Sequence, residues 1–180
     1  MAAVPEPGVP GGTLQTRPIS AADYAEVLDL NHESVHYLSP LSREGLEKLL
    51  EQAPLHRVLE SDGRVLAFII VLQQGAHYGS VNYQWFAQRY PSFLYVDRVV
   101  VSRTRQARGA GSVLYREVFG FARQHGFTCV ACEYDVQPPN PGSARFHARF
   151  GFAEVGRQTV ANGSKTVSLQ LASAPFSEAA

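Results

Sequence analysis

The sequence predicts one α/β domain, built on a twisted mixed sheet of about seven strands with helices on both faces. Its 180 residues, 45% of them hydrophobic and 18% charged, are enough for one sizeable core. Apolar strand patterns alternate with amphipathic helix patterns along most of the chain. We therefore expect a folded domain over residues 14–171, with a flexible N-terminal tail at 1–13 and a C-terminal tail at 172–180.

The first half of the chain predicts three strands and two helices. A stripe from Tyr24 to Val35 has helical spacing, and Ser42 is a natural N-cap for a second helix. Asp62-Gly63 between two apolar strand patterns is a strong hairpin signal. The expected elements are a strand at Leu14–Ile19, helices at Ala21–Tyr37 and Ser42–Pro54, and strands at His56–Glu60 and Val65–Gln73.

The second half contains a strand, helix and strand in succession, which indicates a parallel strand pair joined by a right-handed crossover. Before it, residues 74–92 are rich in aromatic residues and contain no Asp or Glu, and we expect a long functional loop there. Asn162-Gly163 marks a second hairpin. The expected elements are a strand at Phe93–Val101, a helix at Gly111–Gly126, a strand at Thr128–Val136, a short helix at Ser143–Phe150, and strands at Phe152–Val160 and Lys165–Leu171.

The composition argues against several classes of protein. Sixteen basic and sixteen acidic residues give a net charge of zero, which argues against a protein that binds nucleic acid by neutralising many phosphates. No apolar stretch approaches the length of a membrane span, and no signal-peptide pattern precedes the domain, so we expect a cytoplasmic protein. Cys129 and Cys132 fall in a strand pattern that sends their side chains to opposite faces, so they predict neither a redox pair nor a zinc site.

The most informative segment runs from Val99 to Tyr115, where a β-branched strand enters a glycine-containing turn that opens a helix. Gly109 and Gly111 let the backbone approach a ligand closely, and the first-turn amides of a helix attract an anion. Three arginines add positive charge locally: Arg103, Arg105 and Arg108. The junction therefore predicts a phosphate-binding site.

A second motif, His32-Glu33-Ser34-Val35-His36, has the H-E-x-x-H pattern of zinc hydrolases. A catalytic zinc needs a third protein ligand, and the sequence nominates none. We therefore expect no metal, and keep a zinc hydrolase as a remote alternative.

After the second strand of the crossover unit, Asn140 begins a turn into a short helix that ends at Gly151-Phe152. This element, together with Gln106-x-x-Gly109-x-Gly111 after a strand, resembles the GNAT acyltransferases in order and spacing over Leu14 to Leu171. The resemblance implies a GNAT-like single domain and an N-acetyltransferase that uses acetyl-CoA. It extends to a subgroup of predicted acetyltransferases whose substrate is not generally established.

The resemblance also implies the cofactor-binding residues. The pyrophosphate of acetyl-CoA would lie on the glycine turn, and its pantetheine arm would pair with the preceding strand where two parallel strands separate. The residues concerned are Val99, Val100, Val101, Gln106, Ala107, Arg108, Gly109, Ala110, Gly111, Ser112, Asn140 and Ser143.

Two catalytic residues are expected. Most members of the family carry a tyrosine acid seven residues after the asparagine, and here this position is His147, which could instead pack on its helix face. A neutral imidazole can still donate one N–H to the departing thiolate. Asp97 is the expected base, on the strand face of Tyr95, Val99 and Val101 and away from Arg98; the alternative is a structural carboxylate.

The acceptor is expected to be a primary amine of a small molecule, amino acid or peptide. Asn31, Tyr83 and Trp85 are expected to bind it, and Arg89 with His77 would suit an acceptor that carries its own carboxylate. A homodimer is compatible with the sequence. Because the usual tyrosine is missing, the alternative function is a CoA-binding module with little catalysis.

Overall fold

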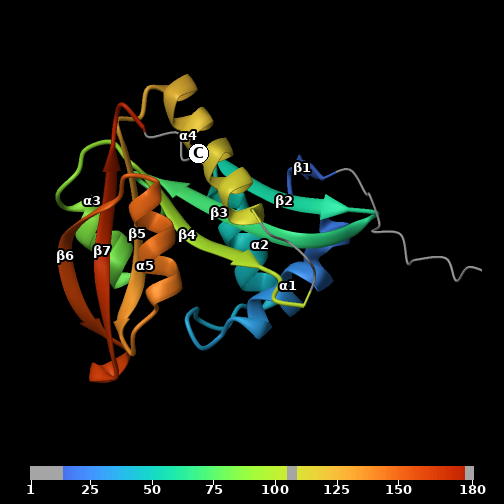
Figure 1. Ribbon diagram of the computed structural model, residues 1–180, viewed down its shortest axis with the longest axis horizontal. Coiled ribbons are helices and arrows are strands. Elements are labelled where there is room, and N and C mark those ends of the chain that lie inside the picture. Colours follow the sequence, from blue (N-terminus) through green and yellow to red (C-terminus); the bar gives the residue numbers. More distant parts are fainter. Residues whose placement is uncertain (1–13, 105–108, 177–180) are drawn as a thin grey trace, which may run out of the picture.

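A computed structural model describes residues 14–104 and 109–176, which form one twisted seven-stranded sheet with helices on both faces (Figure 1). The strand order is β1-β2-β3-β4-β5-β7-β6, and of the described strand pairs only β4–β5 is parallel. The α/β class and the mixed sheet are therefore confirmed. The strands are β1 Gln15–Arg17, β2 Leu55–Ser61, β3 Arg64–Gln73, β4 Leu94–Val101, β5 Cys129–Gln137, β6 Ala153–Val160 and β7 Lys165–Ser173.

The helices divide between the two faces of the sheet. The longest helix, α4, connects the parallel strands β4 and β5, as expected for a crossover unit. The described helices are η1 Ala21–Asp23, α1 Tyr24–Glu33, α2 Arg43–Gln52, α3 Val81–Ala87, α4 Ala110–His125, α5 Pro141–Arg149 and η2 Ala161–Gly163, where η denotes a short 3₁₀ turn.

Each face of the sheet has its own hydrophobic core. On one face, Leu114 and Val118 of α4 pack against strand residues such as Ile69. On the other face, Leu30 of α1 and Leu46 of α2 pack against a second set of strand residues. We call these the α4 core and the α1–α3 core. Because both faces are covered, the central strands are buried on both sides, which explains their long apolar runs.

Both expected hairpins are present. Between β2 and β3, Asp62 and Gly63 have φ values of 52° and 72°, and between β6 and β7, Asn162 and Gly163 have φ values of 53° and 90°. Asn, Asp and Gly tolerate this left-handed region better than other residues, which is why these pairs turn the chain here.

Two expectations about helices were wrong. The first helix ends at Glu33 and not near Tyr37, and the residues after it form turns. The link at 74–92 contains the helix α3, whose N-cap Ser80 accepts a hydrogen bond from the Tyr83 amide. Tyr83 and Phe86 of this helix are buried in the α1–α3 core, so the aromatic residues that suggested a loop serve as a helical packing face.

The last strand continues past Leu171. Strand β7 runs to Ser173, and the Phe176 ring stacks on Phe119 of α4 with ring centroids 4.9 Å apart. Cys129 and Cys132 are free and pack toward opposite cores, as their spacing predicts. Within the described residues, no helix has the length and apolar character needed to cross a membrane.

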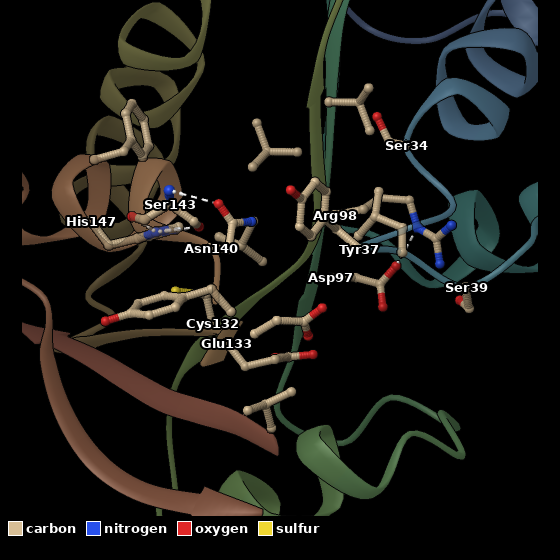
Figure 2. A pocket seen from close by; sticks show the side chains of 18 of the residues that line it. Ser34, Tyr37, Ser39, Asp97, Arg98, Cys132, Glu133, Asn140, Ser143 and His147 are labelled. Carbon is tan, nitrogen blue, oxygen red and sulfur yellow. Dashed lines mark hydrogen bonds and ion pairs between the residues drawn. The ribbon is translucent and has the colours of Figure 1, made fainter. Parts of the chain in front are cut away.

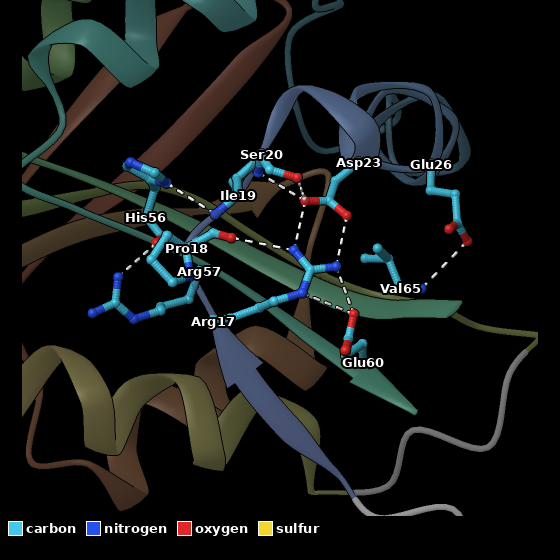
Figure 3. A network of polar contacts seen from close by, with 10 residues as sticks. All are labelled: Arg17, Pro18, Ile19, Ser20, Asp23, Glu26, His56, Arg57, Glu60 and Val65. Carbon is cyan, nitrogen blue, oxygen red and sulfur yellow. Dashed lines mark hydrogen bonds and ion pairs between the residues drawn. The ribbon is translucent and has the colours of Figure 1, made fainter. Parts of the chain in front are cut away.

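A polar network fastens β1 to the beginning of η1 (Figure 3). Arg17 Nη1 and Nη2 donate to the two carboxylate oxygens of Asp23 at 2.7 and 2.8 Å, and Arg17 Nε donates to Glu60 Oε2 at 2.9 Å. The Ser20 amide also donates to Asp23 Oδ2 at 2.7 Å. The hydrogen bonds from Arg17, partly opposed by burial, lower the pKa of Asp23 to about 2. This bidentate pair ties the edge strand to the first helical turn.

We predict that Asp23→Asn lowers the free energy of unfolding by about 1–2 kcal/mol at pH 7, because the Asn amide cannot accept both guanidinium bonds. Since the pKa of Asp23 is lowered in the folded protein, its contribution is complete above about pH 4 and is lost as the pH falls toward 2. Urea unfolding at several pH values measures this.

The matched control is Glu44→Gln, which removes a solvent-exposed pair with Lys48 and should leave the free energy of unfolding nearly unchanged. Equal stability losses for the two variants would contradict the role of the Arg17–Asp23 pair.

Candidate functional site

The parallel strands β4 and β5 stay together for only two residues. Leu94 pairs with Val130 and Tyr95 with Ala131, and beyond them the strands diverge. A cavity of about 1110 Å³ opens between them, lined by both strands, the segment after α1, the N-terminus of α4, helix α5 and the β6–β7 connection. Figure 2 shows side chains from these walls directed toward the space between the strands.

The N-terminus of α4 opens into this cavity. Gly109 caps the helix with φ 82°, and Gly109, Gly111 and Ser112 line the cavity. A Cβ at Gly111 would lie 3.2 Å from the Phe146 ring of α5, so the absence of a side chain lets the two helices approach. Ala110 is buried in the α4 core instead. The expected cofactor-binding residues Gln106, Ala107 and Arg108 lie outside the described residues.

Helix α5 forms the neighbouring wall. Asn140 is its N-cap, and its Oδ1 accepts a hydrogen bond from the Ser143 amide at 3.1 Å. Both residues line the cavity, together with Val99, Val100 and Val101 of β4. The structure therefore brings together the described residues expected to bind the cofactor, apart from Ala110.

His147 lies on the inner face of α5 and is 3% exposed. Its Nδ1 lies 2.8 Å from the Ser143 carbonyl oxygen, which fixes the proton on Nδ1, and its Nε2 then accepts from the Tyr115 hydroxyl at 2.7 Å. Burial lowers the pKa of His147 to about 4, against the raising effect of the Ser143 backbone. His147 is thus a neutral imidazole with both ring nitrogens engaged.

Asp97 lies at a β-bulge in β4. In the register with β3, Ile70 pairs with Arg98 and Val71 with Val96, so Asp97 is an extra residue. Arg98 Nε donates to Asp97 Oδ2 at 2.7 Å, and the Tyr78 hydroxyl donates to Asp97 Oδ1.

The expected separation of Asp97 from Arg98 is therefore wrong, because the bulge interrupts strand alternation. For the same reason, Val99 and Val101 do not share a face with Tyr95. They pack against the α4 core, whereas Tyr95 belongs to the α1–α3 core.

Glu133 of β5 lines the cavity across from Asp97, and sequence reasoning missed it (Figure 2). The Tyr95 hydroxyl lies 2.7 and 2.9 Å from its two carboxylate oxygens, and Asn82 Nδ2 donates to Oε1 at 3.0 Å. Among the described residues, no Lys or Arg is within ion-pair distance of Glu133. Burial raises its pKa to about 7, despite the hydrogen bonds it accepts.

A third carboxylate, Asp135, follows two positions along β5 and also lines the cavity. Lys165 Nζ lies 3.1 Å from Asp135 Oδ2 and donates to the His36 carbonyl oxygen at 2.7 Å. The three carboxylates are close enough for Asp97 and Asp135 both to raise the pKa of Glu133. Two of them thus face a cation, and the third does not.

The residues expected to bind an acceptor do not line the cavity. Tyr83 is buried in the α1–α3 core, and Trp85 packs against Gly156. Asn31 is buried behind the cavity wall, where its Oδ1 accepts from Arg98 Nη1 at 2.8 Å. The wall itself is formed on that side by the segment after α1 and by residues before and within α3: Ser34, Val35, Tyr37, Leu38, Ser39, Pro40, Tyr78, Ser80, Val81 and Asn82.

Arg89 and His77 do not line the cavity either. The Arg89 guanidinium lies 4.1 Å from the centre of the Trp85 ring, and the His77 amide donates to Gln52 Oε1 at 2.7 Å. The suggestion that these two residues receive a carboxylate of the acceptor therefore has no support in the structure.

The H-E-x-x-H segment does not have the geometry of a zinc site. Helix α1 ends at Glu33, so His32 and His36 are not one turn apart on the same helix. In the part of the chain that the structure describes, no cluster of three or more His, Cys, Asp or Glu side chains could hold a metal ion.

Solved structures with the same fold are numerous. Ard1 from Thermoplasma volcanium superposes with a TM-score of 0.71 at 16% identity, covering 89% of this chain and 97% of that one. The ribosomal-protein-S18-alanine N-acetyltransferase from Escherichia coli gives 0.65 at 14% identity, with 89% and 94% covered. The putative acetyltransferase yncA from Salmonella typhimurium, solved with its cofactor acetyl-CoA, gives 0.64 at 16% identity, with 89% and 93% covered.

Sequence comparison is more specific about the family. A search of curated proteins found no match. The model of the acetyltransferase (GNAT) family, however, matches residues 22–152, which include α1 through α5 and the whole β4–α4–β5 unit. The separated parallel strands, the glycine-capped helix between them and this match agree, and the chain belongs to the GNAT acetyltransferase family, whose acyl donor is acetyl-CoA.

Proposed function

We propose that this chain transfers an acetyl group from acetyl-CoA to the nitrogen of a primary amine, by direct attack while both substrates are bound. The observation that carries the proposal is Glu133, a carboxylate without a cationic partner among the described residues and with its pKa raised to about 7, in the same cavity as the N-terminus of α4. A base with such a pKa is suited to accept a proton from an amine near neutral pH.

The cavity has the features needed to hold acetyl-CoA. The first-turn amides of α4 at Gly109 to Ser112 lack intrahelical partners and suit the pyrophosphate, together with Gln106, Ala107 and Arg108. Asn140 and Ser143 of α5 are proposed to contact the pantetheine arm. When bound, acetyl-CoA supplies a thioester carbonyl that an amine can attack.

The backbone of β4 is suited to polarise that carbonyl. The Ser102 amide donates to the Leu66 carbonyl oxygen on the β3 side, and successive amides of a strand alternate between its two edges. The amides of Val99 and Val101 therefore point toward the β5 side, where the strands have separated. We propose that they pair with the cofactor and stabilise the oxyanion that forms on the carbonyl.

Glu133 is a better candidate for the base than Asp97. Asp97 is held by Arg98 and Tyr78, so its charge is already compensated. Glu133 is positioned by Tyr95 and Asn82, and among the described residues it has no cation to neutralise it. We propose that Glu133 accepts the proton of the incoming amine and that Asp97 keeps the bulge and Arg98 in place.

His147 is assigned a positioning role instead of the expected role of acid. Its Nδ1 proton is directed to the Ser143 carbonyl, and its Nε2 holds the Tyr115 hydroxyl at the cavity wall. A thiol has a reference pKa of about 8.5, so the thiolate can leave without a strong acid.

The proposed function is tested by measuring thiol release from acetyl-CoA with a panel of primary amines, and by identifying the acetylated amine by mass spectrometry. We expect turnover with at least one amine. Tight CoA binding without acetyl transfer to any amine would instead identify a CoA-binding module.

We predict that Gly111→Ala weakens CoA binding about fivefold or more, because the new Cβ must displace Phe146 at the cavity wall. Gly120→Ala in the same helix is the matched control, since nothing lies within 4 Å of its added Cβ. It should leave the CoA dissociation constant unchanged and raise the melting temperature. Equal CoA affinities of the two variants in calorimetric titration would contradict the proposed cofactor site.

We predict that Glu133→Gln lowers kcat/KM about 100-fold or more and removes the rise of activity with pH near pH 7, because the amide cannot accept a proton. Asp97→Asn is the comparison. If Asp97→Asn removes the rise of activity near pH 7 while Glu133→Gln keeps that rise, Asp97 is the base.

Thermal unfolding of Glu133→Gln provides the folding control. Because the pKa of Glu133 is raised in the folded protein, its titration lowers the stability as the pH rises from about 4.5 to 7, and the full penalty is present above about pH 7. The variant should therefore be at least as stable as the wild type at pH 8.

We predict that His147→Phe lowers kcat less than about 10-fold and leaves the pH profile between 5 and 9 unchanged, since the pKa of His147 is about 4 and the ring is neutral throughout this range. Steady-state kinetics and CoA titration measure the two quantities. A much larger loss of kcat at normal CoA affinity would show that His147 is the acid after all.

A further inference from the structure

We infer that the preferred acceptor is an amine with no carboxylate next to it, such as the α-amino group of an amino-acid amide, and that free amino acids are poor acceptors. This inference rests on the proposed function and names the acceptor class of the same site. It follows from how charge is distributed on the walls of the cavity.

The part of the cavity between β4 and β5 carries three carboxylates. Asp97 lies at the bulge of β4, and Glu133 and Asp135 lie on β5. Asp97 forms an ion pair with Arg98 at 2.7 Å, and Asp135 forms one with Lys165 at 3.1 Å. Glu133 remains as the charge without a counter-ion in the described residues, so the walls attract one positive charge.

Each cation of these two pairs also donates a hydrogen bond to a second protein group. Arg98 is 4% exposed and also donates to Asn31 Oδ1, while Lys165 also donates to the His36 carbonyl oxygen. A substrate carboxylate would have to share either cation with Asp97 or Asp135, which are nearly buried, so neither cation offers it an uncompensated positive charge.

Two other described cations, Arg103 and Arg149, also line the cavity. Arg103 lies two residues after the end of β4, with its guanidinium 5.9 Å from the centre of the Tyr37 ring, and Arg149 lies on α5, 5.8 Å from the centre of the Phe146 ring. These are the elements proposed to hold acetyl-CoA. Neither arginine forms an ion pair with Glu133, and both charges suit the phosphate groups of acetyl-CoA.

An α-amino acid would bring its carboxylate to within a few ångströms of Glu133 when its amine reaches that residue. Like charges repel strongly at such a distance in a partly desolvated site. An amide in place of the carboxylate removes this repulsion, and the segment after α1, which lines the same cavity, offers it uncharged partners such as Ser34 and Ser39.

The basicity of the amine points the same way. An α-amino group in a peptide-like setting has a pKa of about 8, whereas an alkylamine such as a lysine side chain has one of about 10.4. Proton transfer to a carboxylate with a pKa of about 7 is less unfavourable from the former.

The inference is tested with matched pairs of acceptors at saturating acetyl-CoA: alaninamide with alanine, serinamide with serine, and phenylalaninamide with phenylalanine. The kcat/KM values are expressed per concentration of unprotonated amine, which corrects for the different fractions of unprotonated amine within each pair. We expect the amide to be favoured at least about 10-fold in every pair that reacts.

The outcomes separate the two proposals. Acetylation with equal or higher kcat/KM for the free amino acids overturns the acceptor class and leaves N-acetyl transfer standing. Binding of acetyl-CoA without transfer to any amine overturns the proposed function, and the acceptor class with it.

Charge variants test the cause of the preference. Asp135→Asn leaves the Lys165 charge without its counter-ion, so the amide-to-acid ratio should fall at least about threefold. The double variant Asp135→Asn with Lys165→Gln removes both charges and should keep a ratio within about twofold of the wild type. If the single and double variants change the ratio equally, the electrostatic account is wrong.

Lys165→Gln alone provides a second route if Asp135→Asn does not fold. It leaves Asp135 without its cation, and the ratio should rise. A fall in the ratio would overturn the inference. Thermal unfolding of each variant establishes that the compared proteins are folded.

Discussion

The separation of β4 from β5 after Tyr95 is the constraint on which the site depends. Each strand continues past this point because its other edge stays paired, β4 with β3 and β5 with β7, apart from one register shift in each pair. Antiparallel pairing on both outer edges thus holds the gap open without needing a ligand. Helix α4 joins the two strands, so its N-terminus lies at the opening, where unpaired helix amides and unpaired strand amides meet.

A gap in the middle of a buried sheet also exposes backbone and polar side chains to a partly desolvated space. Glu133 illustrates the cost, because raising its pKa from 4.5 to about 7 means that ionising it in the folded state costs on the order of 3 kcal/mol more than in water. The two core faces around it supply the stability that makes such a cost tolerable. A carboxylate held this way is typical of a site that handles protons.

Periodicity and turn chemistry were enough to predict the strand sequence, both hairpins and the crossover helix, since these depend on local signals. The bulge at Asp97 was not predictable, because strand alternation assumes an unbroken register and the register is set by β3. The helix α3 was missed because its aromatic spacing matched a loop as well as a buried helical face. Glu133 has no sequence motif, since its environment is built from Tyr95, Asn82 and two distant carboxylates.

Two carboxylates of similar chemistry therefore receive different roles from their surroundings. The bulge that places Arg98 beside Asp97 also connects Asp97 to Tyr78, and through Asn31 it reaches the Ser39 carbonyl oxygen in the segment after α1. This chain of contacts links the two loops that border the acceptor side of the cavity. Within it, the ion pair with Arg98 compensates the charge of Asp97. Among the described residues, Glu133 accepts hydrogen bonds only from the neutral side chains of Tyr95 and Asn82, so its charge stays available to an incoming cation.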